Sequence, residues 1–229
     1  MRTGRIRRNL CHAQALRVSD HLTGDAADMF MLEELKRTVE KVTGRGRPAP
    51  REACDTVRDR KPRTFHFKDD GLIPNNPVLP FIFYRSPVRL VASFDPAAIF
   101  EQLFEVNGWG DAWRNGIYDY VHYHSRIHEV LGIARGRALV QFGGPSGRKL
   151  EVKAGDVAIL PAGTGHQCLR ASKDLLVVGA YPATGKYDEC RASKKEHERA
   201  LTAISKVALP RKDPVYGRDG PLLRLWQKQ

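Results

Sequence analysis

The sequence of 229 residues predicts an all-β domain, a β-sandwich or barrel, with a few flanking α-helices. Two observations favour this class. From Thr64 onward, short runs rich in β-branched and aromatic residues are separated by Gly, Pro, Asn and Asp at intervals of about eight to twelve residues. Few stretches of this part have the apolar periodicity of an amphipathic helix. The expected strands are TFHFK, LPFIFYR, IYDYVHYH, HEVLGIA, RALVQF, KLEVK, DVAILP, HQCLR and LLVVGAY.

Residues 1–63 are expected to form a basic, poorly ordered extension. The first nineteen residues contain five Arg and no acidic residue, which fits either a targeting presequence or a start codon placed upstream of a true start at Met29 or Met31. Residues 45–62, RGRPAPREACDTVRDRKP, are Pro-rich and charged and predict a linker. Between these segments one short amphipathic helix is expected over about 31–43, with an apolar stripe formed by Leu32, Leu35, Val39 and Val42.

Two helices are expected beside the strands. The first begins at Asp95 and Pro96, a cap and a first-turn residue, and its inner stripe consists of Ile99, Leu103 and Val106. The second is expected over about 189–206, with Leu201 and Ile204 facing inward. A domain spanning 64–229 would therefore hold every predicted strand.

The overall charge is +12 with an isoelectric point near 9.8, which would suit a nucleic-acid-binding protein. The basic residues are dispersed, however, and no basic helix interleaved with aromatic residues exists, so we expect no nucleic-acid partner. The sequence has no apolar run of about 18 residues and no signal-like apolar stretch, which predicts a cytoplasmic protein without a membrane span. The four cysteines form no CxxC pair, which disfavours a zinc ribbon.

The segment GIYDYVHYHSRIHEVLGIARG indicates a metal site. Side chains alternate along a strand, so His122 and His124 point to one face. Glu129 returns to the same interior after the turn, and His166 enters from the distant hairpin GDVAILPAGTGHQCLR. Three imidazoles and one carboxylate suit one divalent ion of iron, manganese, nickel, cobalt, copper or zinc, with open positions for water or substrate.

Further residues near this constellation are candidates for catalytic or pocket-lining roles. Tyr118 and Tyr120 share the alternation of the histidines and could donate hydroxyl groups to a substrate, with packing in the core as the alternative. Arg170 could pair with an anionic substrate, or it could be a strand-end residue in solvent. Cys168 shares the face of His166 and is expected to act as a small hydrophobe.

His128 is expected at the surface or at an interface. Because it adjoins Glu129 on a strand, its side chain should point away from the metal. The letters HEVLG resemble a zincin motif, but position 132 is Gly where that helical motif needs a second His. We therefore reject the zincin interpretation.

These residues fit the two motifs of the cupin family. The first motif is filled by Gly116, His122, His124, Glu129 and Gly136, and the second by Gly155, Pro161, Gly163 and His166. Arg170 departs from the second motif, which often ends in Asn at that position. More narrowly, HYHSRIHEVLGIARG, LPAGTGH, VVGAYP and LPRKDPVYGRDGPL resemble the YjlB-type group of single-domain bacterial cupins, over residues 64–226.

The resemblance implies a jelly-roll barrel, a double-stranded β-helix, that holds the metal inside. It places the metal-binding core at about 115–182 and the C-terminal helix and tail at 188–229. Cupins include dioxygenases, isomerases, decarboxylases and binding proteins, and many are dimeric, so a homodimer is open here. We expect a metal-dependent, dioxygenase-like enzyme for a small, polar, anionic metabolite. The alternatives are a metal-dependent isomerase or lyase and a non-catalytic binding or sensing module.

Overall fold

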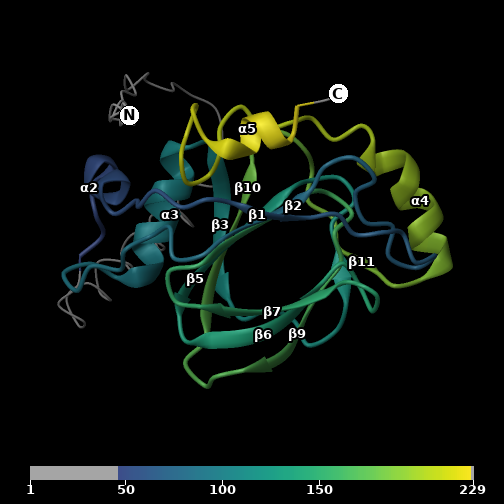
Figure 1. The fold of residues 1–229 in the computed structure, drawn as a ribbon, viewed down its shortest axis with the longest axis horizontal. Helices are drawn as coiled ribbons and strands as arrows, with labels where there is room; N and C mark the ends of the chain where they lie inside the picture. The colour runs from purple at the N-terminus through teal and green to yellow at the C-terminus, as the bar shows by residue number, and fades with distance from the viewer. Residues whose placement is uncertain (1–45, 228–229) are drawn as a thin grey trace, which may run out of the picture.

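The computed structural model describes residues 46–227, which form two facing antiparallel sheets that enclose a barrel (Figure 1). The six-stranded sheet has the order β1 (Arg63–Phe65), β2 (Phe81–Tyr84), β8 (Val157–Leu160), β5 (Glu129–Arg135), β10 (Leu176–Pro182) and β3 (Trp109–Asn115). The five-stranded sheet has the order β11 (Cys190–Arg191), β4 (His122–Tyr123), β9 (His166–Ala171), β6 (Arg137–Phe142) and β7 (Arg148–Lys153). This arrangement confirms the predicted jelly-roll barrel.

Strand β5 shows how the sequence fills the barrel. Its alternate residues Leu131 and Ile133 join the apolar core between the sheets, whereas Val130 and Ala134 join a second core on the outer face. Both faces are thus covered, and every β5 residue except the last is buried. Glu129 begins the strand on the same side as Leu131, which directs its carboxylate into the barrel.

The outer face of the six-stranded sheet is covered by α3 (Pro96–Val106), as predicted. The helix begins at Asp95, whose side chain accepts a hydrogen bond from Ala97 N at 3.3 Å. Gly132 allows the helix to approach the sheet closely, because a Cβ atom there would lie 2.5 Å from the Phe100 ring. Any larger residue at position 132 would push α3 outward.

The segment predicted as a linker packs against the barrel instead, over its described residues 46–62. It contains α2 (Pro50–Asp55), in which Ala53 is fully buried. Val57 forms a β-bridge with Val88, and Arg47 Nε donates to Gln102 Oε1 on α3 at 3.1 Å. The linker prediction was wrong because prolines here start a helix and precede an edge strand, two positions where a missing N–H costs little. The helix predicted over 31–43 lies outside the described residues.

The barrel is followed by α4 (Lys194–Ile204) and α5 (Pro221–Leu225), and α4 falls within the predicted helical span of 189–206. Ala200 and Ile204, four positions apart, form the buried face of α4. Leu201 is 49% exposed, so the prediction that it faces inward was wrong. It lies about 100° around the helix axis from Ala200, outside the buried stripe.

The strands are shorter or placed differently than predicted at two points. The expected strand IYDYVHYH contains only β4, and the residues before it form a loop. The edge strand β3 was not predicted, because its sequence WGDAWRN is polar and mostly exposed. An edge strand pairs on one side only and needs no apolar alternation, so hydrophobic patterning does not reveal it.

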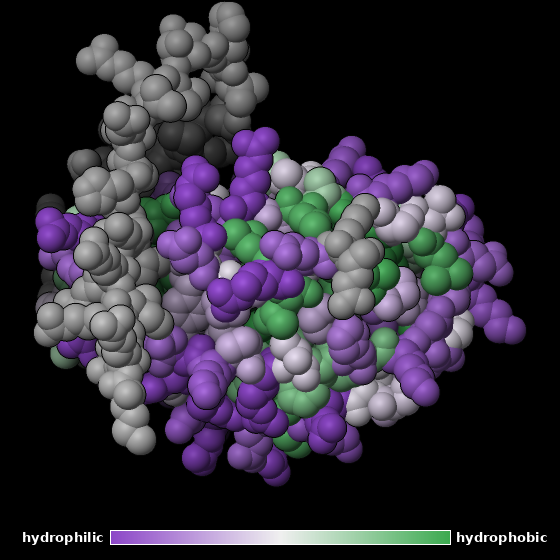
Figure 2. All heavy atoms as spheres, turned by 45° about the horizontal axis from the view of Figure 1, so that its top comes forward, coloured by the Kyte–Doolittle hydropathy of each residue, from purple (hydrophilic) through white to green (hydrophobic). Residues whose placement is uncertain are grey.

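The face shown in Figure 2 is covered mainly by hydrophilic side chains, with hydrophobic ones showing between them. Such a mixture is ordinary for a protein surface. Within residues 46–227, no helix is both long enough and apolar enough to span a membrane.

Candidate metal centre

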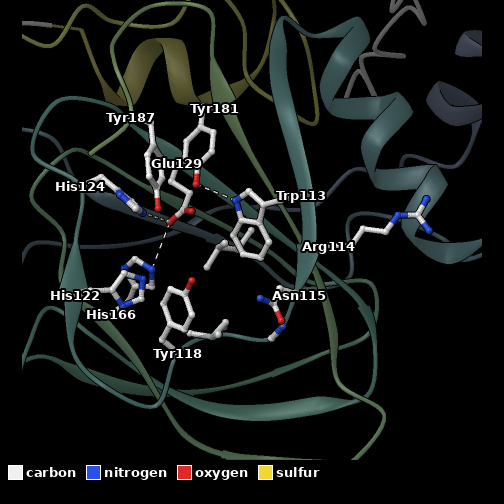
Figure 3. Close-up of a pocket in the computed structure, with 13 residues that line it drawn as sticks. Trp113, Arg114, Asn115, Tyr118, His122, His124, Glu129, His166, Tyr181 and Tyr187 are labelled. Carbon is white, nitrogen blue, oxygen red and sulfur yellow. Dashed lines mark hydrogen bonds and ion pairs between the residues drawn. The ribbon is translucent and has the colours of Figure 1, made fainter. Parts of the chain in front are cut away.

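The predicted metal ligands come together from both sheets (Figure 3). His122 and His166 lie directly opposite each other in the β4–β9 pairing, and their ring centroids are 4.0 Å apart. His124 follows two residues after His122, and one ring nitrogen from each of the three histidines lies within 4.8 Å of the other two. All three side chains are buried. The three histidines therefore form a group that could hold a metal ion.

Glu129 approaches this group from the opposite sheet. Its Oε2 atom lies 3.5 Å from His124 Nε2 and 3.4 Å from His166 Nε2. The side chain is 2% exposed, and Oε2 has no hydrogen-bond partner within the described part of the chain. A buried carboxylate oxygen without a donor is costly, which indicates that a cation normally neutralises it.

Each histidine is oriented by a main-chain carbonyl group at its Nδ1 atom. His122 Nδ1 lies 3.3 Å from Tyr120 O, and His166 Nδ1 lies 3.3 Å from Thr164 O. His124 Nδ1 makes the same kind of contact with Asp188 O. A carbonyl oxygen can only accept, so Nδ1 carries the proton and the Nε2 lone pair is left to face the site. This is the usual arrangement of metal-binding histidines.

The same burial and charges set the pKa values of the site. Burial raises the pKa of Glu129, but the neighbouring histidines, first of all His124, lower it to about 2. Burial lowers the pKa of His124, yet the Glu129 carboxylate and the Asp188 carbonyl raise it to about 9. Burial and the other histidines keep His166 neutral, with a pKa of about 3. The Glu129 carboxylate is therefore ionised and attracts positive charge.

Asp188 fixes the position of His124 from the segment that follows β10. Its carboxylate accepts hydrogen bonds from Ser125 N at 3.0 Å, Ser125 Oγ at 2.6 Å and Arg126 N at 3.1 Å. Its own carbonyl oxygen contacts His124 Nδ1. The residue therefore links the turn after His124 to the imidazole itself. Sequence reasoning missed Asp188, because it lies 64 residues from its partner and outside both motifs.

The four side chains open into a cavity of about 270 Å³. Tyr118 lines this cavity, as predicted, and its ring lies edge-on to His122 with centroids 5.1 Å apart. Gly116 of the first motif also lines the cavity, and the lining residues that sequence reasoning did not select are Trp113, Arg114, Asn115, Ile117, Leu131, Tyr181 and Tyr187. The wall of the cavity is therefore largely aromatic.

Tyr181 connects this wall to the metal ligands. Trp113 Nε1 donates to Tyr181 Oη at 2.9 Å, and the Tyr181 and His124 ring centroids are 5.9 Å apart. Burial and the Glu129 charge raise the pKa of Tyr181, so its hydroxyl stays protonated. The alternation of VVGAYP along β10 was the available signal, since it places Val177, Gly179 and Tyr181 on the inner face.

The cupin family model matches residues 113–187 of this chain. The chain is also 38% identical over 170 residues to a Bacillus subtilis (strain 168) protein described as uncharacterized protein YjlB. That match covers 74% of this chain and 99% of the relative. The chain belongs to the YjlB-type cupins.

Solved structures with partial similarity include two metal-containing enzymes. A Bacillus subtilis oxalate decarboxylase with Mn(II) centres is 23% identical, with a TM-score of 0.29, over 35% of this chain and 22% of that one. An acireductone dioxygenase from Bacillus anthracis, with a cadmium ion in its active centre, is 16% identical, with a TM-score of 0.30, over 40% of this chain and 65% of that one. Similarity at this level does not extend to chemistry.

Two of the predicted pocket residues lie outside the cavity of this cupin. The Tyr120 hydroxyl donates to Glu189 at 3.3 Å, and the Arg191 guanidinium lies 3.5 Å from the centre of the Tyr120 ring. Tyr120 stacks on Tyr118, with centroids 4.8 Å apart, and so supports the cavity wall from behind. It contacts the His122 ring but does not line the cavity.

Arg170 does not line the cavity either, so the structure favours the alternative of a strand-end residue in solvent over a contact with an anionic substrate. Its side chain is 73% exposed and lies 3.8 Å from Glu151 on the outer surface. The reason is a β-bulge: Val140 pairs with Cys168 but Leu139 pairs with Arg170, so Leu169 is an extra residue. The bulge reverses the alternation of β9, and Arg170 points outward. Cys168 keeps the inner face and packs in the barrel core.

His128 points away from the metal group, as expected, but it is completely buried rather than at the surface. Its ring packs on Trp226 with centroids 4.7 Å apart, and its Nδ1 atom accepts from Ala162 N at 2.9 Å. Trp226, which directly follows α5, covers this side of the sheet. Burial lowers the pKa of His128 to about 3.

Proposed function

We propose that this cupin binds one divalent first-row metal ion through His122, His124, Glu129 and His166 and acts as a metal-dependent, dioxygenase-like enzyme. The observation that supports the proposal most strongly is the orphaned Glu129 Oε2 atom facing two imidazole nitrogens. With their Nδ1 atoms directed at carbonyl oxygens, these imidazoles can each turn an Nε2 lone pair toward a bound cation. Nitrogen with carboxylate oxygen is a donor set that suits iron, manganese, nickel, cobalt, copper or zinc.

The bound ion and the residues around it would have different roles in the reaction. When bound, the ion supplies Lewis acidity and, with a redox-active metal such as iron, reactivity toward dioxygen. The main-chain carbonyl groups at the three Nδ1 atoms hold the imidazole rings in the orientation needed for binding. Tyr181 directs a protonated hydroxyl toward the ligand side of Glu129, where it can donate a hydrogen bond to a substrate oxygen. The aromatic wall excludes water from the reacting groups.

The metal part of the proposal is tested by elemental analysis of the full chain purified without chelator. We expect about one equivalent of a first-row metal per chain, and a sharp loss in His166→Ala. Tyr120→Phe is a matched control, because Tyr120 touches His122 without supplying a ligand atom. Wild-type protein that stays metal-free after incubation with Fe²⁺, Mn²⁺ and Zn²⁺ would contradict the proposal.

A metal-dependent isomerase or lyase is the second candidate, and Tyr181 is the observation that favours it. A protonated phenol beside a buried carboxylate can move a proton to or from a bound substrate. Oxygen uptake separates the two: a dioxygenase consumes dioxygen when the metal-loaded protein is screened against small metabolites, whereas an isomerase or lyase converts its substrate without uptake. A metabolite that binds and is never converted would favour a binding or sensing module.

A further inference from the structure

The cavity next to the candidate metal centre has a particular chemical character. Three aromatic side chains, Trp113, Tyr181 and Tyr187, stand around it with Tyr118 on the side of His122. The Tyr181 and Tyr187 rings are 5.4 Å apart, and a Cβ atom on Gly179 would lie 2.1 Å from Trp113. Gly179 thus makes room for the indole ring against the sheet. Such walls fit a flat ligand better than a branched or flexible one.

The cavity offers no cation to a charged ligand among the residues that line it. Arg114 is the one Lys or Arg on its wall, and Figure 3 shows its side chain pointing away toward α3. There its guanidinium pairs with Glu101 at 2.6 Å and with Asp95 at 2.6 Å. The basic groups of Arg137, Lys153 and Arg170 line a different hollow on the outer surface. A carboxylate or phosphate in the aromatic part of the cavity would therefore find no cationic side chain to pair with.

Apart from the four candidate metal ligands, Asn115 and Tyr181 offer the cavity hydrogen-bond donors without formal charge. Gly116 N donates to Asn115 Oδ1 at 2.8 Å, which turns the Asn115 amide so that its NH₂ group is directed into the cavity (Figure 3). Trp113 Nε1 already donates to Tyr181 Oη, so the Tyr181 hydroxyl proton is directed to acceptors on the Glu129 side of the cavity, where a ligand oxygen could also accept it. Both groups suit the oxygen atoms of a neutral ligand.

The net charge of a bound ion and its four protein ligands also limits the charge of a small molecule that could bind there. A divalent ion held by three neutral imidazoles and the Glu129 carboxylate keeps one net positive charge. A ligand that loses one proton on coordination, such as a diphenol or an enol, would neutralise the site. Any further negative charge would be unbalanced inside the barrel.

We propose that the cavity selects compact, planar ligands that carry adjacent oxygen donors and no separate charged group, the class represented by catechol. This inference rests on the proposed metal site and narrows its substrate class. The cavity of about 270 Å³ lies just below the range of ordinary ligand pockets, which are about 300–1,000 Å³, so a single ring is the size that fits.

The test is calorimetric titration of the full-length, zinc-loaded protein with catechol, 2,3-dihydroxybenzoate and 3,4-dihydroxybenzoate. These probes share the donor pair, and the last two add a carboxylate at either ring position. We expect catechol to bind at least about tenfold more tightly than either dihydroxybenzoate. A tenfold difference in Kd corresponds to roughly 1.4 kcal/mol of binding free energy. Equal or tighter binding of either carboxylate probe would overturn the inference.

Variants in the wall sharpen the test. Trp113→Ala should weaken catechol binding by about tenfold while zinc content stays unchanged, and Trp113→Phe should retain most of the affinity. Ile117→Arg supplies the missing cation and should shift preference toward the dihydroxybenzoates. Wild-type protein that takes up none of Zn²⁺, Fe²⁺ and Mn²⁺ would refute the proposed metal site, whereas normal zinc content with catechol binding insensitive to Trp113→Ala would refute the substrate class alone.

Discussion

Replacing Asp188 with Ala tests whether the segment after β10 positions His124 for metal binding. The substitution removes the acceptor of three hydrogen bonds of 2.6–3.1 Å from Ser125 and Arg126, and of a longer one from Cys190 Sγ at 3.4 Å. It leaves the four candidate ligands and the main-chain carbonyl at position 188 in place. A change in metal affinity would therefore act through the position of the His124 ring and through the lost carboxylate charge, and Asp188→Asn, which removes the charge alone, separates the two.

The expected size of the effect follows from these contacts. A hydrogen bond to a charged group contributes about 1.5–3 kcal/mol, but Asp188 is half-buried and water can replace part of what is lost. Only the share that orients His124 alters metal binding, and removal of such an orienting partner typically lowers metal affinity by about 10- to 100-fold. We expect this range for zinc, equal to about 1.4–2.8 kcal/mol.

The assay is competition for Zn²⁺ against a chromophoric chelator. Asp188→Asn keeps one acceptor oxygen and should show a smaller loss, and Asp219→Ala, an exposed residue, should show none. Circular dichroism reports whether each variant is folded. A folded Asp188→Ala protein with a zinc dissociation constant within twofold of wild type would refute the reasoning; if that variant does not fold, the same threshold applies to Asp188→Asn.

Three further predictions concern ligands, boundaries and pH. His166→Ala should lose most of the metal, whereas His128→Ala should keep it. His128→Ala should instead lose about 2–4 kcal/mol of unfolding free energy, measured by urea denaturation, because it leaves a cavity and an unpaired Ala162 N–H. Equal metal loss from the two variants would contradict the prediction that these side chains point to opposite faces. A chain that starts at Thr64 lacks the contacts that residues such as Val57 make with the barrel. Its melting temperature, measured by calorimetry, should be at least about 4–8 °C lower than that of the full chain. An unchanged melting temperature would show that the residues before Thr64 are dispensable for stability. The pKa of His128 is about 3 in the folded protein, whereas its ordinary value is 6.5, so the unfolded chain takes up the proton at a higher pH than the folded chain. The free energy of unfolding should therefore fall as the pH drops from about 6.5 toward 3, by up to about 1.4 kcal/mol per pH unit more than in His128→Asn. Identical slopes for the two proteins would refute this assignment.

The ligand group could be predicted from the sequence because its determinants are local. Alternation along a strand fixes the shared face of His122 and His124, and motif spacing brings in Glu129 and His166. The barrel was predictable for the same reason, since each inner strand shows its own apolar pattern between turn residues.

The remaining features depend on contacts between distant segments, which sequence patterns do not show. The bulge at Leu169 turns Arg170 outward, and neither residue type indicates a bulge. His128 is buried because Trp226, nearly one hundred residues later, covers it. The aromatic wall of the cavity includes Trp113 on an edge strand whose polar sequence resembles a loop.

Glu129 shows why a local inconsistency in the sequence indicates function. It stands on the face of β5 that continues with Leu131 and Ile133, where apolar packing alone would favour another aliphatic residue. Burying its charge is costly unless positive charge neutralises it, and none of the apolar residues on this face supplies that charge. The same burial removes water and strengthens the attraction between the carboxylate and a bound cation. Glu129 thus interrupts the apolar core but increases the affinity for a cation. A binding site at the point where the two sheets meet requires a residue of this kind.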